Sequence, residues 1–180
     1  MTFKLLSKAA LALAAMGLCL SAASAAYKSE YKLSVVPGAS SGWGQTATFF
    51  ADCVRQKSNG RINIKPYFGA QLMAGKQTSE LLLVRRGAID FALASTINWS
   101  PQIKELNLTA LPFFVANNPD RYKAIDAIEA GKSGKMLEKA IEKTGVKFLG
   151  WSENGFRELT TSKGPIEKPE DMKGMKLRVC

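Results

Sequence analysis

The sequence predicts an α/β fold. Across residues 27–150, short stretches with the apolar-polar alternation of strands take turns with stretches whose apolar residues have helical spacing. The stretch from Ile89 to Ala94 is almost wholly apolar, which is typical of a strand buried on both faces of a parallel sheet. Because strand-helix-strand units with short connections build such sheets, we expect one α/β lobe in this part of the chain.

The expected elements follow one another at short intervals. The first strand is expected at Tyr31 to Val36 and precedes a loop rich in glycine and serine. Pro66 lies in the second strand and indicates an edge position, because proline cannot donate a hydrogen bond to a neighbouring strand. The later elements are a helix from about Thr46 to Lys57, a strand from Arg61 to Phe68, a helix from Thr78 to Arg86, a strand from Ile89 to Ala94, helices at Pro119 to Ala130 and Lys135 to Lys143, and a strand from Val146 to Trp151.

One cysteine lies in the first expected helix. Cys53 falls with Phe49, Phe50 and Val54 on the apolar face of that helix, so we interpret it as a packing residue. Cys180 is the last residue of the sequence. The spacing neither argues for a disulfide bond between the two cysteines nor excludes one.

The first 26 residues have the pattern of a secretory signal peptide. Two lysines precede an apolar run from Ala9 to Leu20, and Ala23-Ser24-Ala25 forms the small-x-small site that signal peptidase cleaves. The run is shorter than the roughly 20 apolar residues that a membrane span needs. We therefore expect cleavage after Ala25 or Ala26 and a soluble protein in the periplasm.

Composition excludes several classes of chemistry. The sequence contains no histidine, which removes the usual general base and the commonest metal ligand. We expect no catalytic residues, no metal and no cofactor. The net charge is +10, but the basic residues are scattered rather than gathered into blocks. This distribution indicates a solvated surface with a mild attraction for anions rather than a nucleic-acid-binding protein.

The segment from Glu153 to Val179 carries the most specific pattern in the sequence. It reads ENGFRELTTSKGPIEKPEDMKGMKLRV and contains two arginines, Arg157 and Arg178, each on a short run of apolar-polar alternation. Between them, Pro169 is followed by two acidic residues and then by a glycine. Proline at the first position, acids in the first turn and glycine after the end predict a short helix.

This segment resembles the hallmark region of the extracytoplasmic solute-binding proteins of TRAP transporters, the dicarboxylate-binding family. Three earlier stretches resemble the first lobe of those proteins: NGRINIKPYFGAQL, LLLVRRGAIDFALAS and LNLTALPFF. The resemblance implies a periplasmic-binding-protein-like fold with two lobes. It implies a signal peptide at 1–26, a first lobe with its following helices at 27–150, and a crossover with the start of the second lobe at 151–180.

The resemblance also implies a function and two binding residues. The implied function is that of a receptor that binds a small organic acid in the periplasm and delivers it to a TRAP-type membrane permease. In the family, the arginine of the K-[LI]-R-V strand clamps the ligand carboxylate, and that arginine is Arg178 here. The arginine of N-G-x-R lies beside it and corresponds to Arg157. A guanidinium group suits this role because its two parallel donors match the two oxygens of a carboxylate.

Further ligand contacts are expected at the carboxyl ends of the strands, where α/β sheets open into a crevice. This expectation selects the loop after the first strand, with Trp43, and the loop after the third strand, with Ser95, Asn98 and Trp99. Serine and asparagine offer neutral hydrogen bonds, and the indoles offer apolar walls, although packing is an equally good interpretation of Trp99. The sialic-acid-binding branch of the family has a glutamate at the position of Ser95, so a sialic acid is disfavoured.

The sequence departs from the family at its end. Family members usually have proline after the K-[LI]-R-V strand and continue through the second lobe, whereas this sequence ends at Cys180. We therefore expect an N-terminal fragment of such a protein. Two alternatives stay open, namely a truncated product that binds nothing and an exported enzyme that acts on an anionic substrate.

Overall fold

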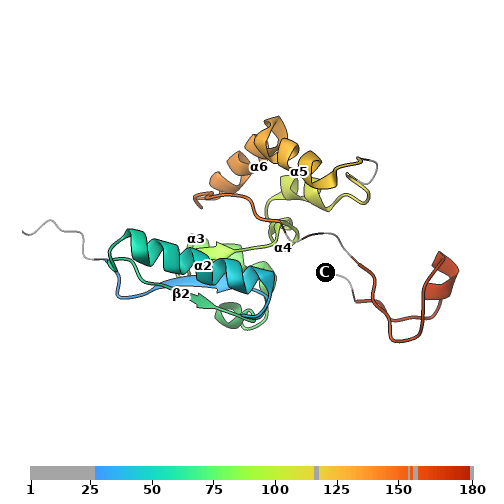
Figure 1. The fold of residues 1–180 in the computed structure, drawn as a ribbon, viewed down its shortest axis with the longest axis horizontal. Coiled ribbons are helices and arrows are strands. Elements are labelled where there is room, and N and C mark those ends of the chain that lie inside the picture. The colour runs from blue at the N-terminus through green and yellow to red at the C-terminus, as the bar shows by residue number, and fades with distance from the viewer. Residues whose placement is uncertain (1–26, 116–117, 154, 156–157, 179–180) are drawn as a thin grey trace, which may run out of the picture.

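The computed structural model describes residues 27–178 apart from 116–117, 154 and 156–157. The expected signal peptide, Arg157 and Cys180 lie outside the described residues. The strands are β1 (Tyr31–Val35), β2 (Ile64–Tyr67) and β3 (Phe91–Leu93), the α-helices are α2 (Gly42–Lys57), α3 (Glu80–Arg85), α4 (Thr96–Trp99), α5 (Arg121–Ala130) and α6 (Lys132–Glu142), and the 3-10 helices are η1 (Gln71–Met73), η2 (Gln77–Ser79), η3 (Lys104–Ala110) and η4 (Pro169–Met172). Figure 1 shows their arrangement, and the predicted α/β class is confirmed.

The three strands form one parallel sheet in the order β2-β1-β3. In the central strand, Leu33 stands opposite Pro66 of β2 and Phe91 of β3. The edge position predicted from Pro66 is confirmed, because within the described residues β2 pairs with β1 alone. The third strand is covered on both faces, as expected, since Phe91 and Leu93 pack against the cluster on one face and Ala92 packs against the cluster on the other. Its side chains are half-buried rather than fully buried.

Helices cover both faces of the sheet. The alternation of β1 sends Leu33 and Val35 to one face, where they pack with Ala47 and Ala51 of α2. Ser34 points to the opposite face and hydrogen-bonds Glu80, the first residue of α3. The result is a layer of α2, a layer of sheet and a layer that begins with α3.

Small residues form the buried face of α2. Gly44, Ala47 and Ala51 are the buried residues of this helix, and their size lets it lie close to the sheet. The prediction that Phe49 lies on the apolar face is wrong, since its side chain is 71% exposed. Cys53 is a half-buried free thiol.

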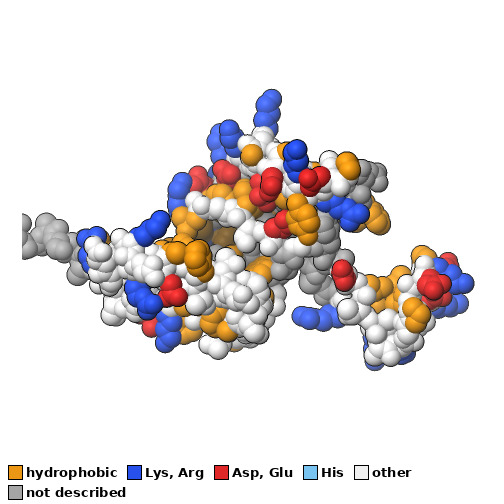
Figure 2. Space-filling view, viewed as in Figure 1, with side chains coloured by type: hydrophobic (Ala, Val, Ile, Leu, Met, Phe, Trp, Pro, Cys, Tyr) orange, Lys and Arg blue, Asp and Glu red, His pale blue; other side chains and the backbone are white. Residues whose placement is uncertain are grey.

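A second hydrophobic cluster lies between α3, α4, η3 and α6. It contains Trp99 and Leu106 together with Leu137 and Ile141 from α6. Helix α6 forms one side of this cluster and α5 packs against α6, and the pair lies above the sheet in the view of Figure 1. Apolar side chains gather between the sheet layer and this pair, as Figure 2 shows.

The C-terminal part of the chain has little regular structure. The strand predicted at Val146 to Trp151 is absent, although Val146, Phe148 and Trp151 pack against the second cluster. The predicted short helix is confirmed as η4, with Pro169 near its start and Asp171 accepting the backbone N–H of Lys168. The segment 158–178 lies apart from the sheet (Figure 1).

No helix among the described residues is long and apolar enough to cross a lipid bilayer. In the same part of the chain, no three His, Cys, Asp or Glu side chains come together in a way that could hold a metal ion.

Candidate ligand-binding site

The carboxyl ends of the three parallel strands bring three connections to one edge of the sheet. The connection after β1 lies against the connection after β2, since the backbone N–H of Gly69 donates to Pro37 O at 3.1 Å and that of Ala70 donates to Val35 O at 3.4 Å. The connection after β3 leads directly into α4. This edge is the place where ligands of open α/β sheets bind.

Ser41 and Gly44 shape the connection after β1. Ser41 caps α2, because its hydroxyl accepts the N–H of Gly44 at 3.0 Å and donates to Gly38 O at 2.6 Å. A Cβ atom on residue 44 would lie 2.6 Å from the Gly38 oxygen, so only glycine fits there. The loop is therefore held tightly against the first turn of α2.

Trp43 lies in that first turn. Its side chain is half-buried and packs against the cluster that contains Leu33 and Val35. It thus combines a packing contact with a partly exposed surface next to the first connection.

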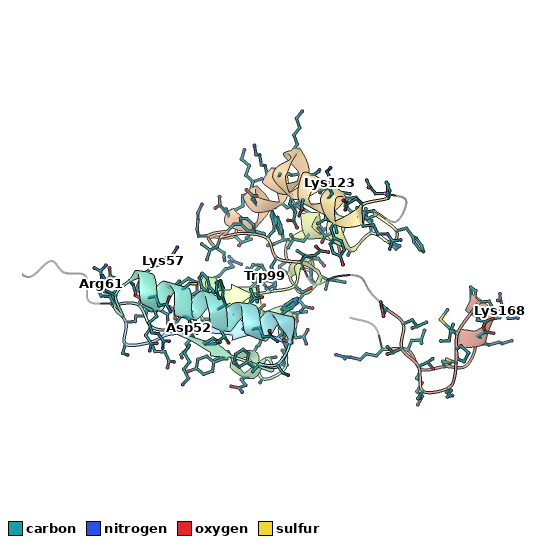
Figure 3. All side chains as sticks on the ribbon, viewed as in Figure 1. Asp52, Lys57, Arg61, Trp99, Lys123 and Lys168 are labelled. Atoms are coloured by element: carbon teal, nitrogen blue, oxygen red, sulfur yellow. The ribbon has the colours of Figure 1, made fainter. Side chains whose placement is uncertain are left out.

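Ser95, Asn98 and Trp99 lie together at the end of β3. Ser95 is the residue before α4, and its side chain forms no capping hydrogen bond with that helix. The Asn98 side chain is half-buried, and its Nδ2 donates to Oε1 of Gln77 at 3.0 Å. The packing interpretation of Trp99 is the one that the structure favours, because its side chain is only 7% exposed and belongs to the second hydrophobic cluster. Figure 3 shows it where the sheet layer meets α5 and α6.

A buried carboxylate lies behind this segment. Glu80 is fully buried, its Oε2 accepts the indole N–H of Trp99 at 3.1 Å, and its Oε1 accepts the hydroxyl of Ser34 at 2.6 Å. Burial raises the pKa of the Glu80 carboxyl, and the two hydrogen bonds act in the opposite direction without cancelling the rise. Each oxygen of the Glu80 carboxyl thus accepts a hydrogen bond from within the protein, as a buried carboxyl group requires.

Arg178 is not brought to this edge by the described structure. The side chain of Arg178 is exposed, and the strand expected around it does not form over residues 175–178. A strand is stable only beside a partner that takes up its backbone hydrogen bonds, and the segment 158–178 lies apart from the sheet (Figure 1). Arg157 lies outside the described residues.

Two residues of this region were not expected from the sequence. Glu80 precedes the apolar run LLLV, where a single acid at the start of a helix looks like an ordinary first-turn residue. Its burial depends on Ser34 and Trp99, which are far away in the sequence. Gly44 gave a weak signal, as one of several glycines at and just before the start of α2.

Two open grooves lie elsewhere. One, of about 670 Å³, follows α6 and is lined by Glu105 with alternating lysines and glutamates of that helix. The other, of about 560 Å³, lies between Phe113, Phe114 and α5. Neither groove is lined by a residue that the sequence predicted for ligand binding. We therefore place the candidate site at the carboxyl edge of the sheet, where the predicted residues Trp43, Ser95 and Asn98 lie.

Comparison with protein families gives one match that covers most of the chain. Residues 33–180 match the DctP model, described as bacterial extracellular solute-binding protein, family 7. The family is one of solute-binding proteins, and its description places them outside the cytoplasm.

Known proteins and structures agree with this match. The chain is 56% identical to a TRAP periplasmic solute-binding protein of Ralstonia eutropha H16, solved with bound (S)-2-acetolactate, with a TM-score of 0.79 over 85% of this chain and 48% of that one. It is 30% identical to the 2,3-diketo-L-gulonate-binding periplasmic protein YiaO of Escherichia coli, over 72% of this chain and 38% of that protein. It is also 30% identical to the C4-dicarboxylate-binding protein DctB of Bacillus subtilis, over 83% of this chain and 41% of that protein. The chain thus spans less than half the length of these relatives.

Proposed function

The chain belongs to family 7 of the bacterial extracellular solute-binding proteins, and on that premise we propose that it acts as a periplasmic receptor for a small organic acid. The receptor binds the acid without chemical change and delivers it to a TRAP-type membrane permease. One observation carries this proposal, namely the 56% identity with a protein solved with the carboxylate (S)-2-acetolactate bound.

The proposed ligand class rests on what the three relatives share. Their names or bound molecules are acetolactate, diketogulonate and C4-dicarboxylates, which differ in size and in the number of hydroxyl groups but all carry a carboxylate. A receptor for such ligands needs one fixed carboxylate partner and variable polar contacts around it. We assign the fixed partner to Arg178, with Arg157 beside it, because the guanidinium fork matches the two carboxylate oxygens.

The variable contacts belong to the carboxyl edge of the sheet. Ser95 supports this assignment best, because its half-buried hydroxyl makes no capping hydrogen bond to α4. Trp43 would contribute the exposed part of its indole as an apolar wall. For Arg178 to reach these residues, the segment 158–178 has to move toward the sheet, and we propose that ligand binding favours such a closed arrangement.

The proposed organisation follows the same logic. Residues 1–26 serve as the signal peptide, 27–150 form the first lobe with its helices, and 151–180 form the crossover toward a second lobe. The extracellular location given for the family agrees with export through that signal.

Isothermal titration calorimetry tests the proposal. The protein is titrated with (S)-2-acetolactate, succinate and D-glucuronate, and with the uncharged compounds succinamide and D-glucose, while NMR follows each compound for chemical change. The Ralstonia eutropha protein serves as the positive control. We expect at least one acid to bind, neither uncharged compound to bind, and every compound to stay intact. Binding of glucose in preference to the acids, or turnover of any acid, would contradict the proposal.

A further inference from the structure

Three side-chain hydrogen bonds fasten the segment after β3 to the segment 77–80. Asn98 Nδ2 donates to Gln77 Oε1 at 3.0 Å, and Trp99 Nε1 donates to Glu80 Oε2 at 3.1 Å. Gln102 Nε2 donates to the backbone oxygen of Thr78 at 2.8 Å. Helix α4 has only four residues and therefore cannot hold its own orientation through backbone hydrogen bonds alone. The three contacts with 77–80, two from the end of α4 and one from Gln102 just after it, hold the segment in place instead.

Glu80 extends the attachment to the centre of the sheet. Its second oxygen accepts the hydroxyl of Ser34, which lies in the buried central strand β1. One carboxylate thus joins β1, α3 and α4 at a site with no exposure to solvent. Ser34 is two residues from Val36, where the first connection begins, and Trp99 ends the helix that follows Ser95.

We infer that Glu80 is a positioning residue, which fixes Ser95 and the α4 segment against the central strand so that the Ser95 hydroxyl is held in place before a ligand arrives. This inference rests on the proposed function, because it gives Ser95 the ligand contact. It also changes the roles of two predicted site residues. The Trp99 indole N–H donates to Glu80 and the Asn98 amide nitrogen donates to Gln77, so we assign both residues to holding the segment and Ser95 to the ligand contact.

The first arm of the test measures the attachment without any ligand. The sequence contains three tryptophans, so a sample with ¹⁵N-labelled tryptophan gives three indole N–H signals, and Trp99→Phe identifies the one from Trp99. In Glu80→Leu, which removes the acceptor, we expect the Trp99 indole proton to exchange with solvent at least about tenfold faster. Glu80→Gln keeps a side-chain oxygen and should restore the slow exchange. Glu105→Gln, the same change at an exposed residue, is the matched control.

The second arm measures binding of (S)-2-acetolactate and succinate by the same variants. Because a loosened support costs affinity, we expect Glu80→Leu to bind about tenfold more weakly, with Glu80→Gln and Glu105→Gln within about twofold of the parent. If Glu80→Leu does not fold, Ser34→Ala, which removes only the hydrogen bond to Oε1, takes its place in both arms.

The outcomes separate the two proposals. A parent protein that binds no acid contradicts the proposed function, and the indole exchange then decides alone whether Glu80 fixes the segment. Unchanged exchange in Glu80→Leu overturns the inference. Faster exchange with unchanged affinity overturns it as well, because Glu80 would then stabilise the fold without positioning a ligand contact.

Discussion

Gly44 approaches Ala39 so closely that a Cβ atom on residue 44 would lie 2.4 Å from the Ala39 carbonyl oxygen. The loop after β1 therefore folds over the first turn of α2, and the absence of a side chain at residue 44 makes this possible. Since this loop forms part of the carboxyl edge of the sheet, a single glycine determines the shape of one wall of the candidate site.

Gly44→Ala should destabilise the protein although alanine is the better helix former. The new methyl group has to push the loop backbone away, and overpacking of this kind costs about 1–3 kcal/mol. Gly42→Ala is the matched control and should be neutral or stabilising, because a Cβ atom on residue 42 would meet nothing within 4 Å. Urea denaturation measures both free energies of unfolding. Equal stability of the two variants would contradict the close contact.

Ser41→Ala should destabilise the protein through the loss of the α2 cap. Its hydroxyl accepts the Gly44 N–H and donates to Gly38 O, and removing such a cap costs about 1 kcal/mol. Ser40→Ala changes the same atoms at an exposed neighbour that does not cap the helix. Thermal unfolding of both variants distinguishes them. If Ser40→Ala lowers the melting temperature as much as Ser41→Ala, the capping role is wrong.

Glu80→Gln should change the pH dependence of stability in a direction fixed by the pKa shift. The pKa of Glu80 is raised by burial from its ordinary value of 4.5, so above pH 4.5 the unfolded chain releases this proton before the folded protein does. The free energy of unfolding of the parent therefore falls, relative to that of the variant, as the pH rises from 4.5 through the pKa of folded Glu80. Other carboxyl groups titrate equally in both proteins and cancel in the difference.

Glu30→Gln provides a control of opposite sign. The hydrogen bond from Tyr67 lowers the pKa of Glu30, so its stabilising effect is present above the ordinary value and is lost as the pH falls. Chemical denaturation of the three proteins between about pH 3 and pH 8 measures the differences. A difference between parent and Glu80→Gln that is independent of pH would show that folded Glu80 titrates normally.

Local patterns predicted most of the fold. The apolar alternation of Tyr31 to Val36 indicated a strand, and the proline at residue 66 indicated an edge strand, both correctly, because each signal depends on only a few neighbouring residues. The residues on the buried face of α2 were predicted less well. Phe49 is exposed and the alanines are buried, because close packing of a helix on a sheet selects small side chains as well as apolar ones.

The candidate site was harder to predict because its parts are distant in the sequence. The importance of Glu80 comes from Ser34, 46 residues before it, and Trp99, 19 residues after it. The strands expected at 146–151 and around Arg178 have suitable alternation but no partner strand in the described residues. A short strand is stable only through such pairing, so alternation alone could not establish it.

Export should remove the N-terminal segment. The two lysines, the apolar run and Ala23-Ser24-Ala25 predict cleavage, so mass spectrometry of the periplasmic protein should find Ala26 or Tyr27 at its N-terminus. Replacing Ala23 and Ala25 with bulky leucines should block cleavage and leave a longer protein. Recovery of the parent protein with Met1 intact in the soluble cytosol would contradict the prediction.

The affinity of Arg178 variants for succinate, measured against succinamide, tests the carboxylate receptor most directly. Arg178→Ala should weaken succinate binding at least about tenfold. The ligand carboxylate would then be buried in the closed arrangement without a charged partner, which costs roughly 2–5 kcal/mol. Arg178→Lys keeps the charge but loses the paired donors, so we expect an intermediate loss. Lys176→Ala removes one positive charge two residues away and should bind like the parent. If folded Arg178→Ala binds succinate as tightly as the parent does, Arg178 does not hold the carboxylate and the account is wrong.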